Sequence, residues 1–302
     1  MKAECETSRR PSTLFSAANL WDVRSVRGGY LVIPNSTHFA LPALPPLRSI
    51  QVFGQTIKYY DHGQGEPLLL IHGLGAEADV WAYCLEPLSQ SHRVIAPDLL
   101  GFGRSSKPLI NYRVATFVEL LDRFLQALAV PRLSLVGNSM GGWIAASFAI
   151  QFPERVNKLV LNDAIGIVAG SVEIPIDLQP SSLQNMREVM EFMFCDKSFV
   201  SDGLVEMAYE LHLERNDGPT IASVLENIRL KVDRLDEQLD RLKVPTLLIW
   251  GDCDRISPLS VAENYQRLIA GSKLEVIAQC GHIPPLEKPQ ELVGRIARFL
   301  AE

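Results

Sequence analysis

Apolar residues along the chain follow two spacings, which predict two kinds of regular structure. Short continuous apolar runs, rich in leucine or β-branched residues, are typical of strands buried on both faces of a sheet. Six predicted strands, most of them runs of this kind, lie at residues 68–71, 94–96, 133–136, 159–161, 246–250 and 274–277. Between them, apolar residues recur at helical spacing, as at residues 117–128 and at 292–300 after Pro289. The alternation predicts a mostly parallel α/β sheet with helices on both faces.

Two further strands are expected before the first parallel one. Residues 50–53 and 56–60 flank the pair Gly54-Gln55 and predict a leading antiparallel hairpin. With the six runs above, the predicted sheet has eight strands. Residues 48–165 and 244–302 together form this predicted core.

The rest of the chain departs from the alternation in two places. Prolines interrupt short apolar patches in residues 1–47, which predicts a loosely ordered N-terminal extension. A transit peptide and an over-extended translation start both remain open. Residues 166–243 carry helical patterns rich in Met and Phe where a strand is due, and we interpret them as an inserted helical cap. Those side chains fit either plain core packing or the wall of an adaptable apolar acyl pocket.

Charge and composition argue against several classes of partner. The chain has 302 residues, 47% of them hydrophobic, and a formal net charge of −6 without a Lys or Arg run. Nucleic acid and anionic lipid are therefore not expected partners. No window reaches the ~18 apolar residues that span a bilayer, and Glu4 and Glu6 stand where a secretory signal would be basic. We expect a cytoplasmic protein that acts on a small molecule, although organelle targeting and the oligomeric state remain open.

The cysteines and glycines predict neither a metal nor a nucleotide cofactor. The five cysteines are odd in number, widely spaced and without a CxxC pair, which favours free thiols over a disulfide framework or a zinc site. They are Cys5, Cys84, Cys195, Cys253 and Cys280. Cys253 and Cys280 are expected to lie in neighbouring loops. The sequence Gly-Phe-Gly at residues 101–103 lacks the third glycine and the helix of a dinucleotide turn.

A nucleophile is predicted at Ser139. The sequence Gly-Asn-Ser-Met-Gly-Gly at residues 137–142 follows a predicted strand and opens a helix. A serine on such a sharp turn needs neighbours without Cβ atoms, which Gly137 and Gly141 provide. The helix N-terminus also points free amides at negative charge that develops near the serine. The alternative is a glycine-rich helix start that merely packs tightly.

A serine hydroxyl needs a base, and the base needs a carboxylate. His282 lies in a turn-rich loop after the last predicted strand, from which its side chain can reach over the carboxyl edge of the sheet. Asp254 follows the strand that ends at Trp250, and we take Asp252 for a turn residue. Surface or packing roles are expected for the histidines elsewhere, namely His38, His62, His92 and His212.

Two backbone amides are expected to bind the oxyanion of a tetrahedral intermediate. One belongs to Met140, directly after the nucleophile. The other is expected from Leu74, in the glycine-containing turn after residues 68–71. His72 precedes this turn and is expected to brace the loop rather than to act as a base.

In combination these segments resemble the α/β-hydrolase superfamily, of the serine esterase and lipase type with a helical cap. The resemblance covers about residues 48–302 and rests on segments 72–75, 98–105, 137–142, 251–254 and 281–284 in that order. It implies a catalytic triad of Ser139, Asp254 and His282, an oxyanion hole at Leu74 and Met140, and a structural role for residues 98–105. Asp163, just after the predicted strand at residues 159–161, is a rival for the acid, because some members of the superfamily carry the acid after that strand.

Departures from related families narrow the expected reaction. Haloalkane dehalogenases and epoxide hydrolases place aspartate at the elbow, so Ser139 excludes them. The elbow is similar to that of the meta-cleavage C–C hydrolases, yet Ala76 and Ile283 stand where those enzymes typically carry proline and tryptophan. The sequence therefore favours cleavage of an ester or thioester of a small, largely apolar substrate through an acyl-enzyme. A C–C hydrolase and a hydrolase-like small-molecule receptor are the alternatives.

Overall fold

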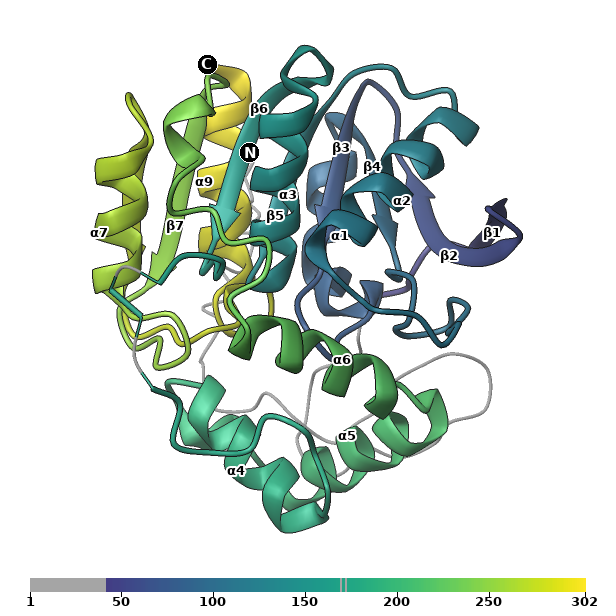
Figure 1. The fold of residues 1–302 in the computed structure, drawn as a ribbon, viewed down its shortest axis with the longest axis vertical. Helices are drawn as coiled ribbons and strands as arrows, with labels where there is room; N and C mark the ends of the chain where they lie inside the picture. Colours follow the sequence, from purple (N-terminus) through teal and green to yellow (C-terminus); the bar gives the residue numbers. More distant parts are fainter. Residues whose placement is uncertain (1–41, 169, 172) are drawn as a thin grey trace, which may run out of the picture.

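A central sheet organises the structure, a computed structural model that describes residues 42–168, 170, 171 and 173–302 (Figure 1). Of the predicted N-terminal extension at residues 1–47, residues 1–41 lie outside the described part of the chain. Within the described part of the chain the sheet has eight strands, in the order β1-β2-β4-β3-β5-β6-β7-β8. The strands are β1 (Arg48–Val52), β2 (Gln55–His62), β3 (Glu66–Ile71), β4 (His92–Pro97), β5 (Leu133–Asn138), β6 (Val156–Asn162), β7 (Thr246–Gly251) and β8 (Lys273–Ile277).

The strand pairing confirms the predicted fold class. β1 and β2 form the leading antiparallel hairpin, and β2 also pairs antiparallel with β4. All pairs from β4 through β3 to β8 are parallel. The six predicted strands fall inside β3 to β8, and each observed strand extends beyond its predicted range at one end or at both. Parallel strands direct their carboxyl ends to one edge, where the loops that carry the site begin.

Helices cover both faces of the sheet. They are α1 (Ala82–Ser89), α2 (Val114–Ala127), α3 (Met140–Gln151), α4 (Leu183–Met193), α5 (Asp202–Arg215), α6 (Gly218–Arg229), α7 (Leu259–Leu268), α8 (Pro284–Glu287) and α9 (Pro289–Ala301). Short 3₁₀ turns add η1 (Ala78–Trp81), η2 (Pro153–Arg155), η3 (Lys197–Phe199) and η4 (Leu239–Arg241). The helical spacing read at residues 117–128 and 292–300 belongs to α2 and α9, and Pro289 opens α9 as predicted.

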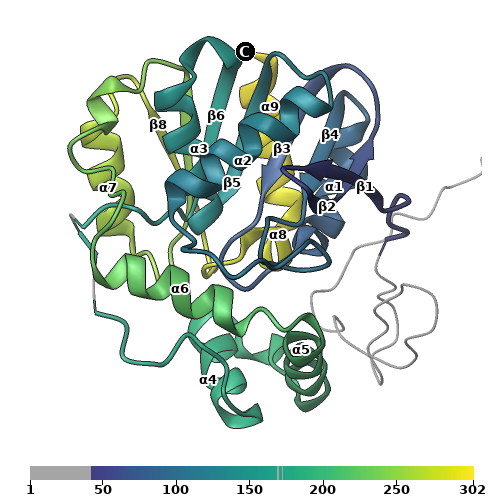
Figure 2. The same cartoon turned by 45° about the vertical axis from the view of Figure 1, so that its right-hand side comes forward.

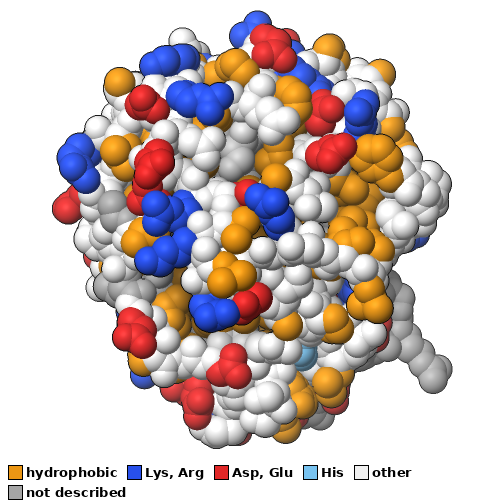
Figure 3. Space-filling model, viewed as in Figure 1, with side chains coloured by type: hydrophobic (Ala, Val, Ile, Leu, Met, Phe, Trp, Pro, Cys, Tyr) orange, Lys and Arg blue, Asp and Glu red, His pale blue; other side chains and the backbone are white. Residues whose placement is uncertain are grey.

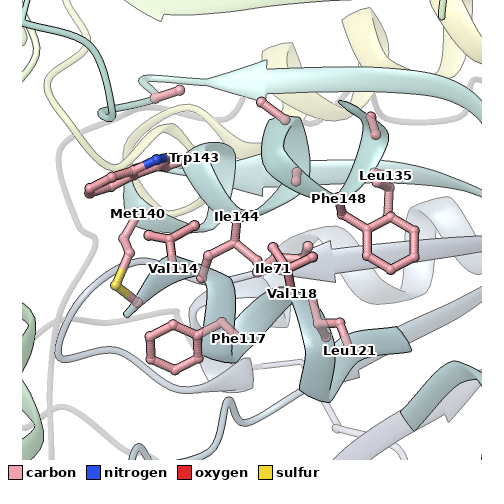
Figure 4. Packing of buried hydrophobic residues seen from close by; sticks show 14 of the residues in the cluster. Ile71, Val114, Phe117, Val118, Leu121, Leu135, Met140, Trp143, Ile144 and Phe148 are labelled. Atoms are coloured by element: carbon pink, nitrogen blue, oxygen red, sulfur yellow. The ribbon is translucent and has the colours of Figure 1, made fainter. Parts of the chain in front are cut away.

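Successive residues of each buried strand point to opposite faces, so the sheet separates two apolar cores. Leu69 and Ile71 of β3 pack with α2, α3 and α7, whereas Leu68 and Leu70 pack with α1 and α9. In the first core, side chains of α2 such as Phe117 and of α3 such as Ile144 meet over the strands (Figure 4). Burial on both faces explains why these strands read as continuous apolar runs.

Helices α4, α5 and α6 lie together at one end of the sheet (Figure 2). α4 and α5 share an apolar cluster of their own, here called the cap cluster, which consists of Met186, Met190, Phe194, Val200, Leu204 and Val205. α6 differs, because its Ile221 and Val224 belong to the larger core. The interpretation of residues 166–243 as an inserted cap stays a prediction, but much of its Met and Phe content is buried in packing.

Charges of both signs are interspersed over the face shown in Figure 3. Among the described residues, no helix is both long enough and apolar enough to cross a bilayer.

Candidate active site

The turn between β5 and α3 presents Ser139 in an unusual backbone conformation. Its φ and ψ are +56° and −121°, in a region that side-chain-bearing residues rarely occupy. A Cβ on Gly137 would lie 2.2 Å from the Gly141 carbonyl oxygen, and one on Gly141 would lie 2.2 Å from that of Ile71. Both glycines are therefore required by close backbone contacts, as the sequence predicted. Strained conformations of this kind gather at functional sites.

The structure brings Ser139, His282 and Asp254 into one hydrogen-bonded series. Nε2 of His282 lies 2.8 Å from Oγ of Ser139, and Nδ1 lies 2.8 Å from Oδ2 of Asp254. Because a carboxylate only accepts, Nδ1 carries the proton and leaves Nε2 free to accept from the serine. Oδ1 of Asp254 accepts the backbone amides of Ile256 and Ser257, at 2.8 and 3.0 Å. This arrangement can remove the serine proton and stabilise the resulting imidazolium.

The predicted oxyanion donors lie on either side of this serine. Met140 begins α3, where helix amides have no partner within the helix. The loop that carries Leu74 approaches from the other side, since a Cβ built on Gly73 would lie 3.1 Å from Cβ of Ser139. Their role as donors stays a prediction that this placement permits.

His72 holds the loop that carries Leu74. Its Nδ1 lies 2.7 Å from the Gly73 carbonyl oxygen, and its Nε2 accepts the Leu99 amide at 2.9 Å. Complete burial lowers the pKa of His72, so the ring stays neutral while it joins the two loops. The other described histidines contact residues away from Ser139, namely Glu86 for His62, Ser91 for His92 and Asp217 for His212.

Two side chains that sequence reasoning left without a role fix the histidine loop. Nδ2 of Asn138 donates to the backbone oxygens of His282 and Asn162, both at 3.2 Å. Glu287 is buried and accepts the amides of Cys195 and Gly281 on Oε2, at 2.8 and 3.0 Å. Its Oε1 accepts the Ile283 amide at 3.2 Å.

The position of Glu287, five residues after His282 and followed by Lys288-Pro289, was visible in the sequence. One of its partners, however, is the amide of Cys195, 92 residues earlier in the chain. Burial raises the pKa of Glu287 even though these three amides favour its ionised form.

Helix α4 is joined to the acid and base loops. The His282 amide donates to the Met193 carbonyl oxygen at 2.8 Å, and Arg255 donates to that of Phe194 at 3.1 Å. Cys195 forms a disulfide with Cys253, across a Cα separation of 5.5 Å. The expectation of free thiols is therefore wrong for this pair, because 58 residues separate them and no local pattern signals the pairing.

The remaining described cysteines, Cys84 and Cys280, are free and buried. Cys253 does neighbour Cys280, since its amide donates to the Cys280 carbonyl oxygen at 2.9 Å, but its sulfur bonds Cys195.

One group in the described part of the chain has the spacing of metal ligands. Sγ of Cys195, Sγ of Cys253 and a carboxylate oxygen of Asp252 lie within 4.8 Å of one another. Thiolates, not disulfide sulfurs, ligate metals. With the disulfide formed, this group is not set up to hold an ion.

The side chains of Ser139 and His282 are nearly closed off from solvent. Ser139 is 7% exposed and His282 is 3% exposed. Ile283, next to the base, packs against the cap cluster, and Ile221 of α6 lies beside Gly75 of the oxyanion loop. Electrostatic interactions between groups with so little exposure to water are stronger than at the surface.

The comparisons with known proteins agree with this geometry. The sequence matches the family described as the alpha/beta hydrolase fold over residues 66–218 and 195–289. It is 35% identical over 265 residues to 2-hydroxy-6-oxo-2,4-heptadienoate hydrolase of Pseudomonas putida, covering 84% of this chain and 96% of that protein.

Two solved structures illustrate the range of similar proteins. One is a membrane phospholipase A described as a bacterial virulence factor, with a TM-score of 0.77, 33% identity and coverage of 85% of this chain and 86% of that chain. The other is a meta-cleavage product hydrolase from Pseudomonas fluorescens, with a TM-score of 0.76, 29% identity and coverage of 84% and 97%.

Proposed function

Because the chain belongs to the α/β hydrolase fold family, we propose that Ser139, His282 and Asp254 are its nucleophile, base and acid. Oγ of Ser139 adds to a substrate carbonyl carbon while its proton passes to Nε2 of His282. The amides of Met140 and Leu74 bind the resulting oxyanion. Collapse of this intermediate expels the leaving group, which takes the proton from His282. Water, activated by the same histidine, then releases the acyl group from Ser139.

The bond cleaved in our proposal is a carbon–carbon bond next to a ketone, in a small conjugated oxo-acid. The observation that carries this proposal is the closed hydrogen-bonded series at Ser139, in a chain that covers 96% of a 2-hydroxy-6-oxo-2,4-heptadienoate hydrolase. Carbon is a poor leaving group unless its electron pair is delocalised. Transfer of the 2-hydroxyl proton to the carbon next to the 6-oxo group makes that carbon saturated, so that after cleavage its electron pair delocalises over the remaining C=C bond and the new 2-oxo group. One water is consumed, and a carboxylic acid and a shortened dienoic acid are formed. This proposal replaces the ester hydrolase that the sequence favoured.

Ester hydrolysis remains the second candidate because of one feature of the site. Ile283 places an apolar side chain beside the base and in contact with the cap cluster. An apolar side chain at this position is compatible with an acyl substrate, and the similar phospholipase A structure supports this possibility. The two reactions share the addition of Ser139 to a carbonyl carbon and the hydrolysis of the acyl-enzyme, and they differ in the leaving group and in the tautomerisation that precedes cleavage of the carbon–carbon bond.

A direct test offers both substrate classes to one preparation. The disappearance of 2-hydroxy-6-oxo-2,4-heptadienoate is followed by its absorbance, and p-nitrophenyl esters from acetyl to dodecanoyl are followed by nitrophenolate release. We expect a higher kcat/KM on the dienoate, and loss of both activities in Ser139→Ala. A higher kcat/KM on long-chain esters would move the assignment to the second candidate. Binding without turnover of either class would instead indicate a receptor.

A further inference from the structure

Asp163 is a buried carboxyl group next to the predicted acid that the mechanism above does not use. It follows β6 directly, has a positive φ of +46° and is fully buried. Its Oδ1 accepts the amide of Gly251, the last residue of β7, at 2.9 Å. The rival acid considered from the sequence is thus held between two strand ends, and His282 contacts Asp254 instead.

The other oxygen of Asp163 has an unusual environment. Among the described residues, no N–H or O–H group donates to Oδ2, although it is buried. Asp254 is close by, because its amide donates at 3.3 Å to the carbonyl oxygen of Gly251, the residue whose own amide Asp163 accepts, and the two carboxyl groups interact electrostatically. Two ionised carboxylates can only accept, so a hydrogen bond between them requires one proton.

The distribution of donors determines which of the two carboxyl groups carries that proton. Asp254 accepts from three groups, namely the amides of Ile256 and Ser257 and Nδ1 of His282. Asp163 accepts from one, the Gly251 amide. Each donor favours the ionised form of its acceptor, so Asp254 is the carboxylate and Asp163 is the acid.

The charged neighbours of Asp163 act in the same direction. Burial raises its pKa well above the usual range, and the negative charges of Asp254 and, from α8, Glu287 raise it further. A second negative charge in this enclosed space would be costly, whereas a neutral carboxylic acid can donate.

We propose that Asp163 is a positioning residue, which stays protonated and donates a hydrogen bond from Oδ2 to the carboxylate of Asp254. The inference rests on the proposed roles of Ser139, His282 and Asp254, which it extends by a fourth member. The series then runs from the Gly251 amide through Asp163 and Asp254 to His282 and Ser139. Asp163 holds the acid in the orientation that Nδ1 of His282 requires, without adding charge.

The test uses covalent labelling of Ser139, which needs no knowledge of the substrate. An alkyl fluorophosphonate reacts with an activated serine: the Oγ–P bond forms, the P–F bond breaks, and fluoride leaves as His282 takes the proton. The labelling rate is measured against pH by mass spectrometry of the intact parent, Asp163→Asn and Asp163→Ala proteins. Asparagine keeps both contacts, since its oxygen can accept from Gly251 and its NH₂ group can donate to Asp254.

We expect Asp163→Asn to label within about threefold of the parent, with its acid limb at the same pH. Asp163→Ala should label about tenfold or more slowly, as expected for losing one hydrogen bond to a charged group. An acid limb that moves down by about one pH unit in Asp163→Asn would mean that Asp163 is ionised in the parent and that the substitution removes its negative charge, and this result would overturn the proposal. Parent-like labelling of Asp163→Ala would also overturn it.

A spectroscopic measurement keeps the test independent of activity and of the folding of the alanine variant. The infrared difference between the parent and Asp163→Asn should contain the C=O band of a protonated carboxylic acid at neutral pH. Its absence would contradict the proposal. Failure of the proposed function has a different signature, because Ser139→Ala would then be labelled as fast as the parent.

Discussion

Replacing Glu287 by alanine removes the acceptor of three backbone amides at once, and we expect it to destabilise the fold and the active site together. The amides belong to Cys195, Gly281 and Ile283, at 2.8, 3.0 and 3.2 Å from the carboxylate. Each buried donor left unpaired costs about 1–3 kcal/mol, which gives about 3–9 kcal/mol for three. Water entering the vacated space and relief from burying the carboxyl group offset part of this. We therefore expect the free energy of unfolding to fall by about 3 kcal/mol, a large share of the roughly 5–15 kcal/mol of a typical domain.

The assay is urea unfolding followed by tryptophan fluorescence at neutral pH, together with the rate of fluorophosphonate labelling of Ser139. Glu287→Gln should lose less, about 1–2 kcal/mol, because its one remaining oxygen can keep the Cys195 and Gly281 amides while its NH₂ group faces Ile283. The control is Glu291→Ala, whose half-exposed carboxylate pairs with Arg295 at 3.6 Å. That surface pair should change stability by at most about 1 kcal/mol. If Glu287→Ala were as stable as the control, the three hydrogen bonds would not hold the loops as argued.

Three further predictions concern the disulfide, the buried acid and the elbow. Reduction of the Cys195–Cys253 disulfide with dithiothreitol should lower the unfolding free energy of the parent by about 2–4 kcal/mol and leave that of Cys195→Ser unchanged. An equal response of both proteins would refute a stabilising role for this disulfide. The pKa of Asp163 is raised in the folded state, so its contribution to stability is complete below the unfolded pKa of about 3.9 and declines as pH rises toward the folded pKa. Between these two pKa values the stability of Asp163→Asn relative to the parent should therefore increase by about 1.4 kcal/mol per pH unit. A difference that does not change with pH would contradict this. Gly141→Ala should lower the free energy of unfolding by about 3 kcal/mol or more, since its Cβ would lie 2.2 Å from a backbone oxygen. The control is Gly203→Ala in α5, where nothing lies within 4 Å of the added Cβ, and this change should be neutral or stabilising in the same unfolding assay.

Features set by short stretches of sequence were predictable. The strands buried on both faces show as apolar runs, and the crowded elbow requires Gly137 and Gly141 on either side of Ser139. His282 was identifiable because it lies in a turn-rich loop after the last strand. In each case the physical requirement acts on neighbouring residues, so it leaves a local pattern.

Features that depend on the meeting of distant loops were not predictable. Glu287 joins the segment after α4 to the histidine loop, and Cys195 pairs with a cysteine 58 residues away. Asp163 could be weighed only as a rival acid, because its neighbour Asp254 becomes visible only once β6 and β7 are paired. The sequence favoured an ester because Ala76 and Ile283 depart from the pattern of the C–C hydrolases, and the leaving group stays a proposal because the reacting atoms of both reactions are the same.

The hydrogen bond from the His282 amide to the Met193 carbonyl oxygen makes the base depend on the position of α4. The Cys195–Cys253 disulfide ties the segment after this helix to the loop that carries Asp254. The loops on either side of the imidazole therefore share one anchor outside the sheet, so a change that displaced the end of α4 would disturb the partners of both ring nitrogens at once.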